Sequence, residues 1–120
     1  MASELRVNTL KDASGNNSVA TSVVASGSAK AWLDYDQSAN TTDGSYNVSS
    51  VSDNAAGLFV PTLTSAMSDT NWILVHTVNA FTAQLDTAKT TTTAGCRTRD
   101  ANANNTDATT NNIAVHGDLA

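Results

Sequence analysis

The most apolar stretch of the chain reads Trp72-Ile73-Leu74-Val75-His76-Thr77-Val78. It is rich in β-branched and aromatic side chains, which favour extended backbone. A continuous apolar run of this length is typical of a strand that is buried on both faces. The sequence therefore predicts that this run forms the central strand of a β-sheet.

Shorter apolar runs flank that stretch and are separated by Asn, Asp, Ser and Gly, which favour turns. The clearest is Ala29-Lys30-Ala31-Trp32-Leu33-Asp34-Tyr35-Asp36, in which alternate residues share one face of a strand. Further strands are expected at 46–52, 58–63, 81–85, 95–99 and 113–116, and Pro61 indicates an edge position or a bulge. About eight short strands with short connections predict an all-β fold, either a barrel or an antiparallel β-sandwich, and we favour a jelly-roll-like sandwich.

Polar segments predict the connections between these strands. The loop 37–44 ends in the turn signal Asp43-Gly44, and 53–57 and 66–71 are expected to turn or connect. Two tracts rich in Thr and Asn, 87–94 and 102–112, suit loops, although Thr is also good strand material on a half-exposed face.

The expected core is thin. Only 5% of the 120 residues are aromatic, whereas 18 Thr, 13 Asn and 13 Ser fill over a third of the chain. The core is expected to contain Trp32, Leu33, Tyr35, Tyr46, Val48, Val51, Phe59, Trp72, Ile73, Val75, Ile113 and Val115. Because so small a chain has little apolar material to bury, partner chains are expected to supply core and cover sheet edges, with a self-sufficient monomer as the alternative.

The first 28 residues differ from the rest in having few apolar side chains. A short strand followed by a turn around Gly15 is expected there. The segment 1–28 is therefore predicted to be an N-terminal anchoring arm that docks by strand addition or interchain wrapping, with a disordered tail as the alternative. Its expected anchoring residues are Leu5, Val7, Leu10, Val19 and Val23. Residues 29–120 are predicted to form one β-sandwich knob domain.

Charge and hydropathy argue against several classes of partner. Charged residues make up 14% of the chain, the net charge is −5, and no basic patch is visible, so nucleic-acid binding is not expected. No apolar run approaches the roughly 20 residues of a membrane helix, so membrane insertion is not expected either. The N-terminal residues lack an apolar signal region, which predicts folding in a cytoplasm. The single Cys96 suits a buried small hydrophobe, an intermolecular bridge or a free thiol.

The residues that could carry chemistry do not form an active-site pattern. His76 is expected to be a hydrogen-bonded core or interface residue, and His116 near Asp118 has no nucleophile turn beside it. Asp34 and Asp36 share a strand face and could hold a divalent cation, but the residues after them do not complete an EF-hand loop, which favours a solvated strand end. Phosphate-binding glycine motifs are absent as well. The sequence predicts no catalytic residue, no cofactor and no metal, so we expect a protein that is not an enzyme.

Two regions resemble a known group of proteins. The stretch from Met1 to Ser18 resembles the N-terminal segment of tail-fibre-like proteins of marine bacteriophages, particularly those of cyanobacteria and abundant pelagic bacteria. The stretches Ser28–Asp36, Ser45–Asn54 and Val115–Asp118 resemble the recurrent terminal β-domain of the same proteins. Two departures are visible: arm and knob abut at Gly27 without a repetitive shaft, and Ala55-Ala56 replaces a Gly-rich turn.

The resemblance implies a structural protein of the virion, with a β-sandwich-like knob in a homotrimer that binds other virion proteins. A short fibre-like or tail-appendage protein is the first expectation, and a capsid decoration or cement protein on the phage head is the alternative. A third hypothesis, from another class, is a carbohydrate-binding module for a host surface glycan. In that case Trp32, Trp72, Tyr35 and Tyr46 would stack on sugar rings.

Overall fold

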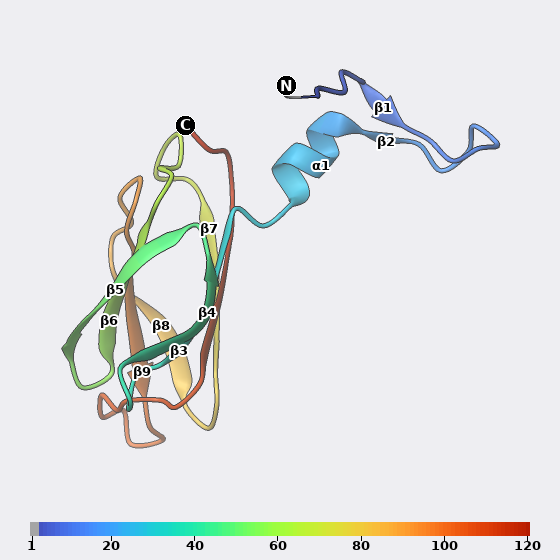
Figure 1. Cartoon of the computed structure of the whole chain (residues 1–120). Helices are drawn as coiled ribbons and strands as arrows, with labels where there is room; N and C mark the ends of the chain where they lie inside the picture. The colour runs from blue at the N-terminus through green and yellow to red at the C-terminus, as the bar shows by residue number, and fades with distance from the viewer. Residues whose placement is uncertain (1–2) are drawn as a thin grey trace.

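The computed structural model describes residues 3–120, so Met1 and Ala2 of the predicted arm lie outside the described residues. Strands dominate it, in antiparallel sheets of two, four and four strands, and one short helix accompanies them. The two four-stranded sheets pack face to face (Figure 1). The predicted all-β antiparallel sandwich is therefore confirmed.

The sandwich consists of two sheets whose strands all pair antiparallel. The first sheet has the order β4 (Thr41–Tyr46), β3 (Ala31–Asp36), β10 (Asn111–His116) and β7 (Ile73–Val78). The second sheet has the order β5 (Val48–Ala55), β6 (Leu58–Leu63), β9 (Gly95–Arg99) and β8 (Thr82–Thr87). The chain crosses between the sheets after β4, β6, β7 and β9, so the edge strands β4 and β5 are joined at one side and β7 and β8 at the other.

The core lies between the sheets and follows from the alternation of side chains along each strand. Leu33 on β3 is paired with Ile113 on β10, and both point inward. Tyr35 packs against Phe59 of the opposite sheet with ring centroids 5.1 Å apart. Burying an aromatic side chain of this size stabilises the fold by about 2 kcal/mol. Ala31, Leu63, Met67, Ala94, Cys96 and Val115 complete much of the buried cluster.

The predicted core is right in part. Leu33, Tyr35, Phe59, Trp72, Ile113 and Val115 are buried, and Val48 and Val51 are half-buried against them. Four other predicted core residues, Trp32, Tyr46, Ile73 and Val75, are exposed, so for these the prediction is wrong. They occupy the alternate positions of the first sheet, and their side chains point away from the second sheet.

The prediction of a central strand at 72–78 is also wrong. β7 lies at the edge of the first sheet, and its only strand partner within residues 3–120 is β10. Its side chains alternate between exposed and half-buried positions, rather than being buried on both faces. The composition of this strand is that of an interior strand, whereas its position is that of an edge.

The turn predicted at Asp43-Gly44 and the edge position or bulge predicted at Pro61 need correction. Asp43-Gly44 lies inside β4; the turn comes earlier, at 37–40, and the corner between the sheets is Asn47, with φ of 57°. Pro61 is neither at an edge nor in a bulge, since β6 has two neighbours and Pro61 pairs in register with Val51. The ladder between β6 and β9 covers only Leu58 and Phe59, so the missing N–H of the proline falls outside it.

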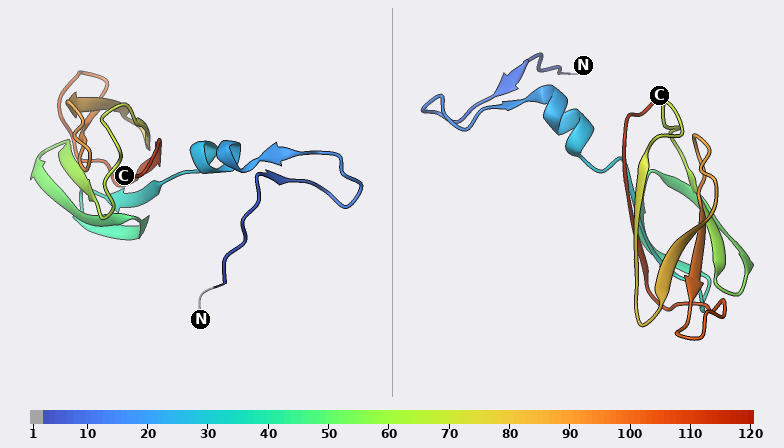
Figure 2. Two further views of the ribbon diagram at one scale, coloured as in Figure 1. Left: turned by 90° about the horizontal axis from the view of Figure 1, so that it is seen from above. Right: turned by 180° about the vertical axis from the view of Figure 1, so that it is seen from behind.

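The N-terminal segment stands away from the sandwich in both views of Figure 2. Strands β1 (Thr9–Leu10) and β2 (Val19–Ala20) form a hairpin, which leads into helix α1 (Thr21–Gly27). The sequence did not predict this helix. Lys30 joins the two parts: its N–H donates to the Val115 carbonyl in the sandwich, and its ammonium donates to carbonyls at the end of α1.

Candidate functional site

The arm, residues 3–28, is held together by polar contacts and exposes its apolar side chains. Thr21 donates from Oγ1 to the carbonyls of Val7 and Asn8, at 3.1 and 3.2 Å, and Asp12 accepts two backbone N–H groups in the hairpin loop. Of the predicted anchoring residues, Leu5, Val7, Leu10 and Val23 are exposed, Leu5 by 81%, and Val19 is half-buried.

An arm built this way has little stability of its own. A two-stranded hairpin is marginal in water, and an isolated helix needs about 12–15 residues, whereas α1 has seven. No arm residue belongs to the core cluster of the sandwich. The arm therefore presents exposed leucine and valine side chains and has no packed core of its own.

A second feature is an apolar strip across the outer face of the first sheet. Residues directly opposite on paired strands share a face, and the register aligns Tyr46, Trp32, Ala114 and Val75 in one row. Ile73 lies two residues further along β7. Tyr46, Trp32, Val75 and Ile73 are 58, 46, 48 and 62% exposed. Contiguous exposed apolar residues of this kind mark interaction surfaces.

Gly44 fixes how the indole of Trp32 lies on this face. A Cβ atom at position 44 would come within 3.1 Å of the ring, so the glycine lets the indole lie over β4. Asp34 and Asn112 occupy the adjacent row and point the same way. The arrangement places two half-exposed aromatic rings beside a carboxylate and an amide.

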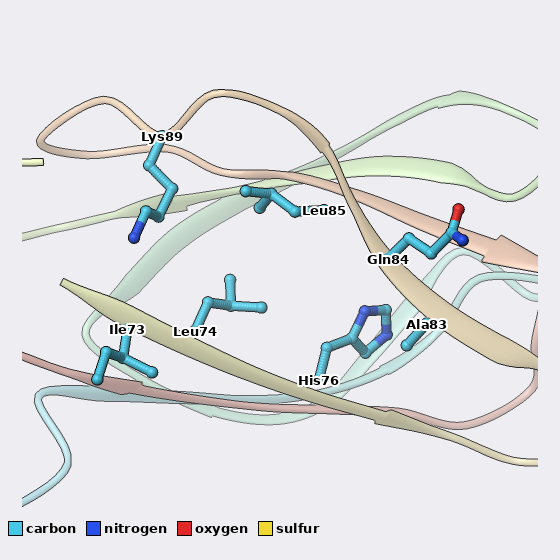
Figure 3. A pocket seen from close by; sticks show the side chains of 7 residues that line it. All are labelled: Ile73, Leu74, His76, Ala83, Gln84, Leu85 and Lys89. Carbon is cyan, nitrogen blue, oxygen red and sulfur yellow. The ribbon is translucent and has the colours of Figure 1, made fainter. Parts of the chain in front are cut away.

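A third feature, the edge cleft, opens between β7 and β8 with a volume of about 340 Å³ (Figure 3). Its lining residues are Ile73, Leu74, His76, Ala83, Gln84, Leu85 and Lys89. Lys89 closes one end, since its ammonium donates to the carbonyl of Trp72 and lies 5.1 Å from the indole centroid. The indole Nε1–H donates to the carbonyl of Thr90 at 2.8 Å. The cleft thus has an apolar floor and one cationic wall.

His76 is the titratable group on the floor of the edge cleft. The Asn111 amide nitrogen donates to the carbonyls of Tyr35 and Ala108, both at 3.2 Å, which leaves its oxygen to accept from His76 Nε2 at 3.0 Å. The imidazole therefore carries a proton on Nε2. Its Nδ1 is buried without a hydrogen-bond partner, and burial lowers the pKa of His76, partly opposed by the bond to Asn111. The predicted hydrogen-bonded role of His76 is confirmed.

The other groups considered for chemistry have structural roles. Asp36 accepts from the Ala39 N–H and the Ser38 hydroxyl in the turn after β3, and these bonds lower its pKa. Cys96 is buried, and desolvation raises its pKa to about 12. No group of three or more His, Cys, Asp or Glu side chains within residues 3–120 is arranged to hold a metal ion. In the same part of the chain, no helix has the length and apolar composition needed to cross a membrane.

Sequence reasoning missed Gly44, Leu85 and Lys89 as parts of these surfaces. Lys89 sits in a Thr-rich tract with no local pattern, and only the fold brings it to Trp72. The four aromatics considered for sugar binding are divided: Trp32 and Tyr46 are exposed and adjacent, whereas Trp72 and Tyr35 are buried.

Comparison of the chain with known proteins finds no matching family model, no similar curated protein and no similar solved structure.

Proposed function

We propose that this protein is a non-enzymatic structural component of a bacteriophage particle, assembled through its arm. The observation that carries the proposal is the exposed apolar arm, which stands apart from the sandwich (Figure 1). A segment that fully buries none of its own leucines and valines needs a second surface. The resemblance to tail-fibre-like proteins supports a virion as the place where that surface is found.

Within this proposal, a short fibre-like or tail-appendage protein is favoured over capsid decoration because the arm resembles fibre N-termini. The homotrimeric state implied by the resemblance is part of the same proposal. The arm would hold the protein in the particle with the sandwich projecting from it. The apolar strip and the edge cleft supply further surface for contact with other copies or other virion proteins.

The test is the copy number per virion, measured by quantitative mass spectrometry against the major capsid protein. A small number that matches tail symmetry supports the tail appendage. A number comparable with that of the capsid protein supports head decoration instead. Absence from purified particles would overturn the structural proposal.

A second candidate, carbohydrate binding, is favoured by one observation: Trp32 and Tyr46 lie side by side on the surface, next to Asp34 and Asn112. Exposed aromatic rings flanked by hydrogen-bonding groups suit a sugar ring. Because Trp72 is buried, a host polysaccharide that stacks on the exposed indole should change the fluorescence of Trp32 alone. The Trp32→Ala variant should lose the response and Ile73→Ala should keep it; no response at millimolar sugar removes this candidate.

A further inference from the structure

The free edge of β7 lacks the features that keep other edges from pairing. Within residues 3–120, the other edge strands of the sandwich, β4, β5 and β8, each carry an aspartate and a register shift. β7 has no carboxylate, lysine or proline, and its register with β10 is continuous. Charges and bulges on edge strands prevent unwanted pairing, so an edge without them is a template for another strand.

The backbone groups on this edge can be assigned from the ladder with β10. The N–H of Asn79 donates to the carbonyl of Thr110 at 3.3 Å, which continues the register of β7 and β10. Hydrogen bonding alternates along an antiparallel strand, so the odd-numbered residues of β7 form its backbone hydrogen bonds with β10. Leu74, His76 and Val78 therefore direct their N–H and C=O groups away from β10, toward the edge cleft. Trp72 is also even-numbered, so its carbonyl should point away from β10. It accepts the ammonium of Lys89 there, which agrees with the assignment.

We propose that the segment Leu5–Leu10 from the arm of a second copy adds to this edge as a fifth strand of the first sheet, a step that rests on the assembly role proposed for the arm. Leu5 and Val7 lie on one face of an extended strand, and both are exposed in their own chain. Added to β7, they enter the edge cleft above Leu74 and Leu85.

Length fits this occupant. The cleft runs along β7 from Ile73 to His76, which is about 13 Å at about 3.3 Å per residue, and four arm residues cover it. Its lining contains Lys89 and no carboxylate; Glu4, which immediately precedes the added strand, is paired with Arg6 of that strand, so residues 4–10 bring no net charge to the cleft. In strand addition the main-chain hydrogen bonds supply affinity, and pockets for alternate side chains supply specificity.

A second copy is favoured over the same chain because the arm points away from its own sandwich (Figure 2). Lys30 holds the end of α1 at the junction, so folding back would break its contacts with the helix carbonyls. Each copy then offers one arm and one edge, which is a head-to-tail contact. Such a contact closes into a ring, as a homotrimer would require, or continues as a filament.

The first test compares two adjacent substitutions in the full chain, Val7→Asp, which faces the cleft, and Asn8→Asp, which faces away. Both add one negative charge to a segment that contacts no core residue, so neither endangers folding of the sandwich. Light scattering gives the mass, and NMR hydrogen exchange reports the amides of Leu74 and His76. We expect wild type and Asn8→Asp to be associated and Val7→Asp to be monomeric. In the two associated proteins, both amides should exchange at least about tenfold more slowly than in Val7→Asp.

The second test establishes that the strand comes from another chain. Isotope-labelled Val7→Asp chain has an intact edge and a blocked arm, and unlabelled Leu74→Lys chain has an intact arm and a charged cleft. Mixing them should restore slow exchange at Leu74 and His76 of the labelled chain. Unlabelled wild type serves as the donor if Leu74→Lys fails to fold.

Three results overturn the inference. A wild type that is monomeric at millimolar concentration shows that no second copy is bound, and slow exchange in a monomer shows that a chain covers its own edge. Slow exchange that survives Val7→Asp in an associated species shows that two β7 edges pair with each other. In each case the copy number on particles still tests the proposed virion role separately.

Discussion

Removing the side chain of Asn111 should cost the sandwich much of its stability. The side chain is fully buried and joins three elements of the fold: its nitrogen donates to the carbonyls of Tyr35 and Ala108, and its oxygen accepts from His76. The Asn111→Ala substitution removes all three bonds. The imidazole N–H of His76 is left without a partner in the interior, and the Tyr35 and Ala108 carbonyls each lose one bond, although Ala108 keeps the N–H of Gln37.

The magnitude follows from those three contacts. An intramolecular hydrogen bond contributes about 1 kcal/mol net, and more when its loss strands a buried partner. Three of them give a loss of about 3 kcal/mol in the free energy of unfolding. For a domain of this size, about 1 kcal/mol lowers Tm by about 4–8 °C, so Tm should fall by more than about 10 °C.

The assay is urea unfolding at low protein concentration, followed by circular dichroism. The matched control is Asn112→Ala, the next residue of β10, whose side chain is exposed and which should change stability by less than about 0.5 kcal/mol. A loss below about 1 kcal/mol in Asn111→Ala, with an unchanged m-value, would refute the assignment of Asn111 as the buried polar link between β3, β7 and the 108 loop.

Three further predictions concern single residues. The pKa of His76 is lowered in the folded chain, so the unfolded chain binds the proton first as pH falls. The free energy of unfolding should therefore fall as pH drops below 6.5, by at most about 1.4 kcal/mol per pH unit. Urea midpoints measure this dependence, and the same slope in His76→Gln would contradict it. The thiol of Cys96, with its pKa raised to about 12, should not react with a thiol reagent near neutral pH until the chain unfolds; rapid labelling of folded protein would show that it is accessible. Gly57→Ala should lower the free energy of unfolding by well over the ~1–2 kcal/mol that a left-handed backbone alone costs an alanine. The reason is that φ is 65° and a Cβ would also lie 2.4 Å from the Thr98 carbonyl oxygen. A urea midpoint close to that of wild type would contradict this prediction.

The parts of the fold that follow from local pattern could be predicted from the sequence. Alternation in 31–36 places Ala31, Leu33 and Tyr35 inside and Trp32 outside, and the strand adopts that arrangement. The composition nevertheless favours burial of Trp32, because a chain with so few aromatics is expected to place each of them in the core. Packing of Ala, Cys and Met around Tyr35 and Phe59 fills the core without it.

The parts that depend on long-range pairing could not be predicted. The order of strands is decided by contacts between residues far apart in the chain, such as Ile113 with His76 and Leu33, and no local pattern encodes them. Helix α1 has two adjacent valines and no apolar repeat, so its sequence carries no helical signal. The edge cleft was missed for the same reason, since Lys89 and Leu85 reach it only through the fold.

The composition of β7 does not match its position at the edge of the sheet, and this mismatch links the edge cleft with the apolar strip. Its composition predicts burial on both faces, but an added strand at the edge covers only the backbone and the inner side chains. Ile73 and Val75 would stay exposed on the outer face, where Val75 lies in one row with Trp32 and Tyr46. Full burial of β7 thus requires contact over the apolar strip as well, and such contact would take Trp32 away from any sugar. The emission of Trp32 decides between these uses: a blue shift on self-association, absent in Val7→Asp, places the strip between copies, whereas an unshifted emission in the associated protein leaves the strip free for an external ligand.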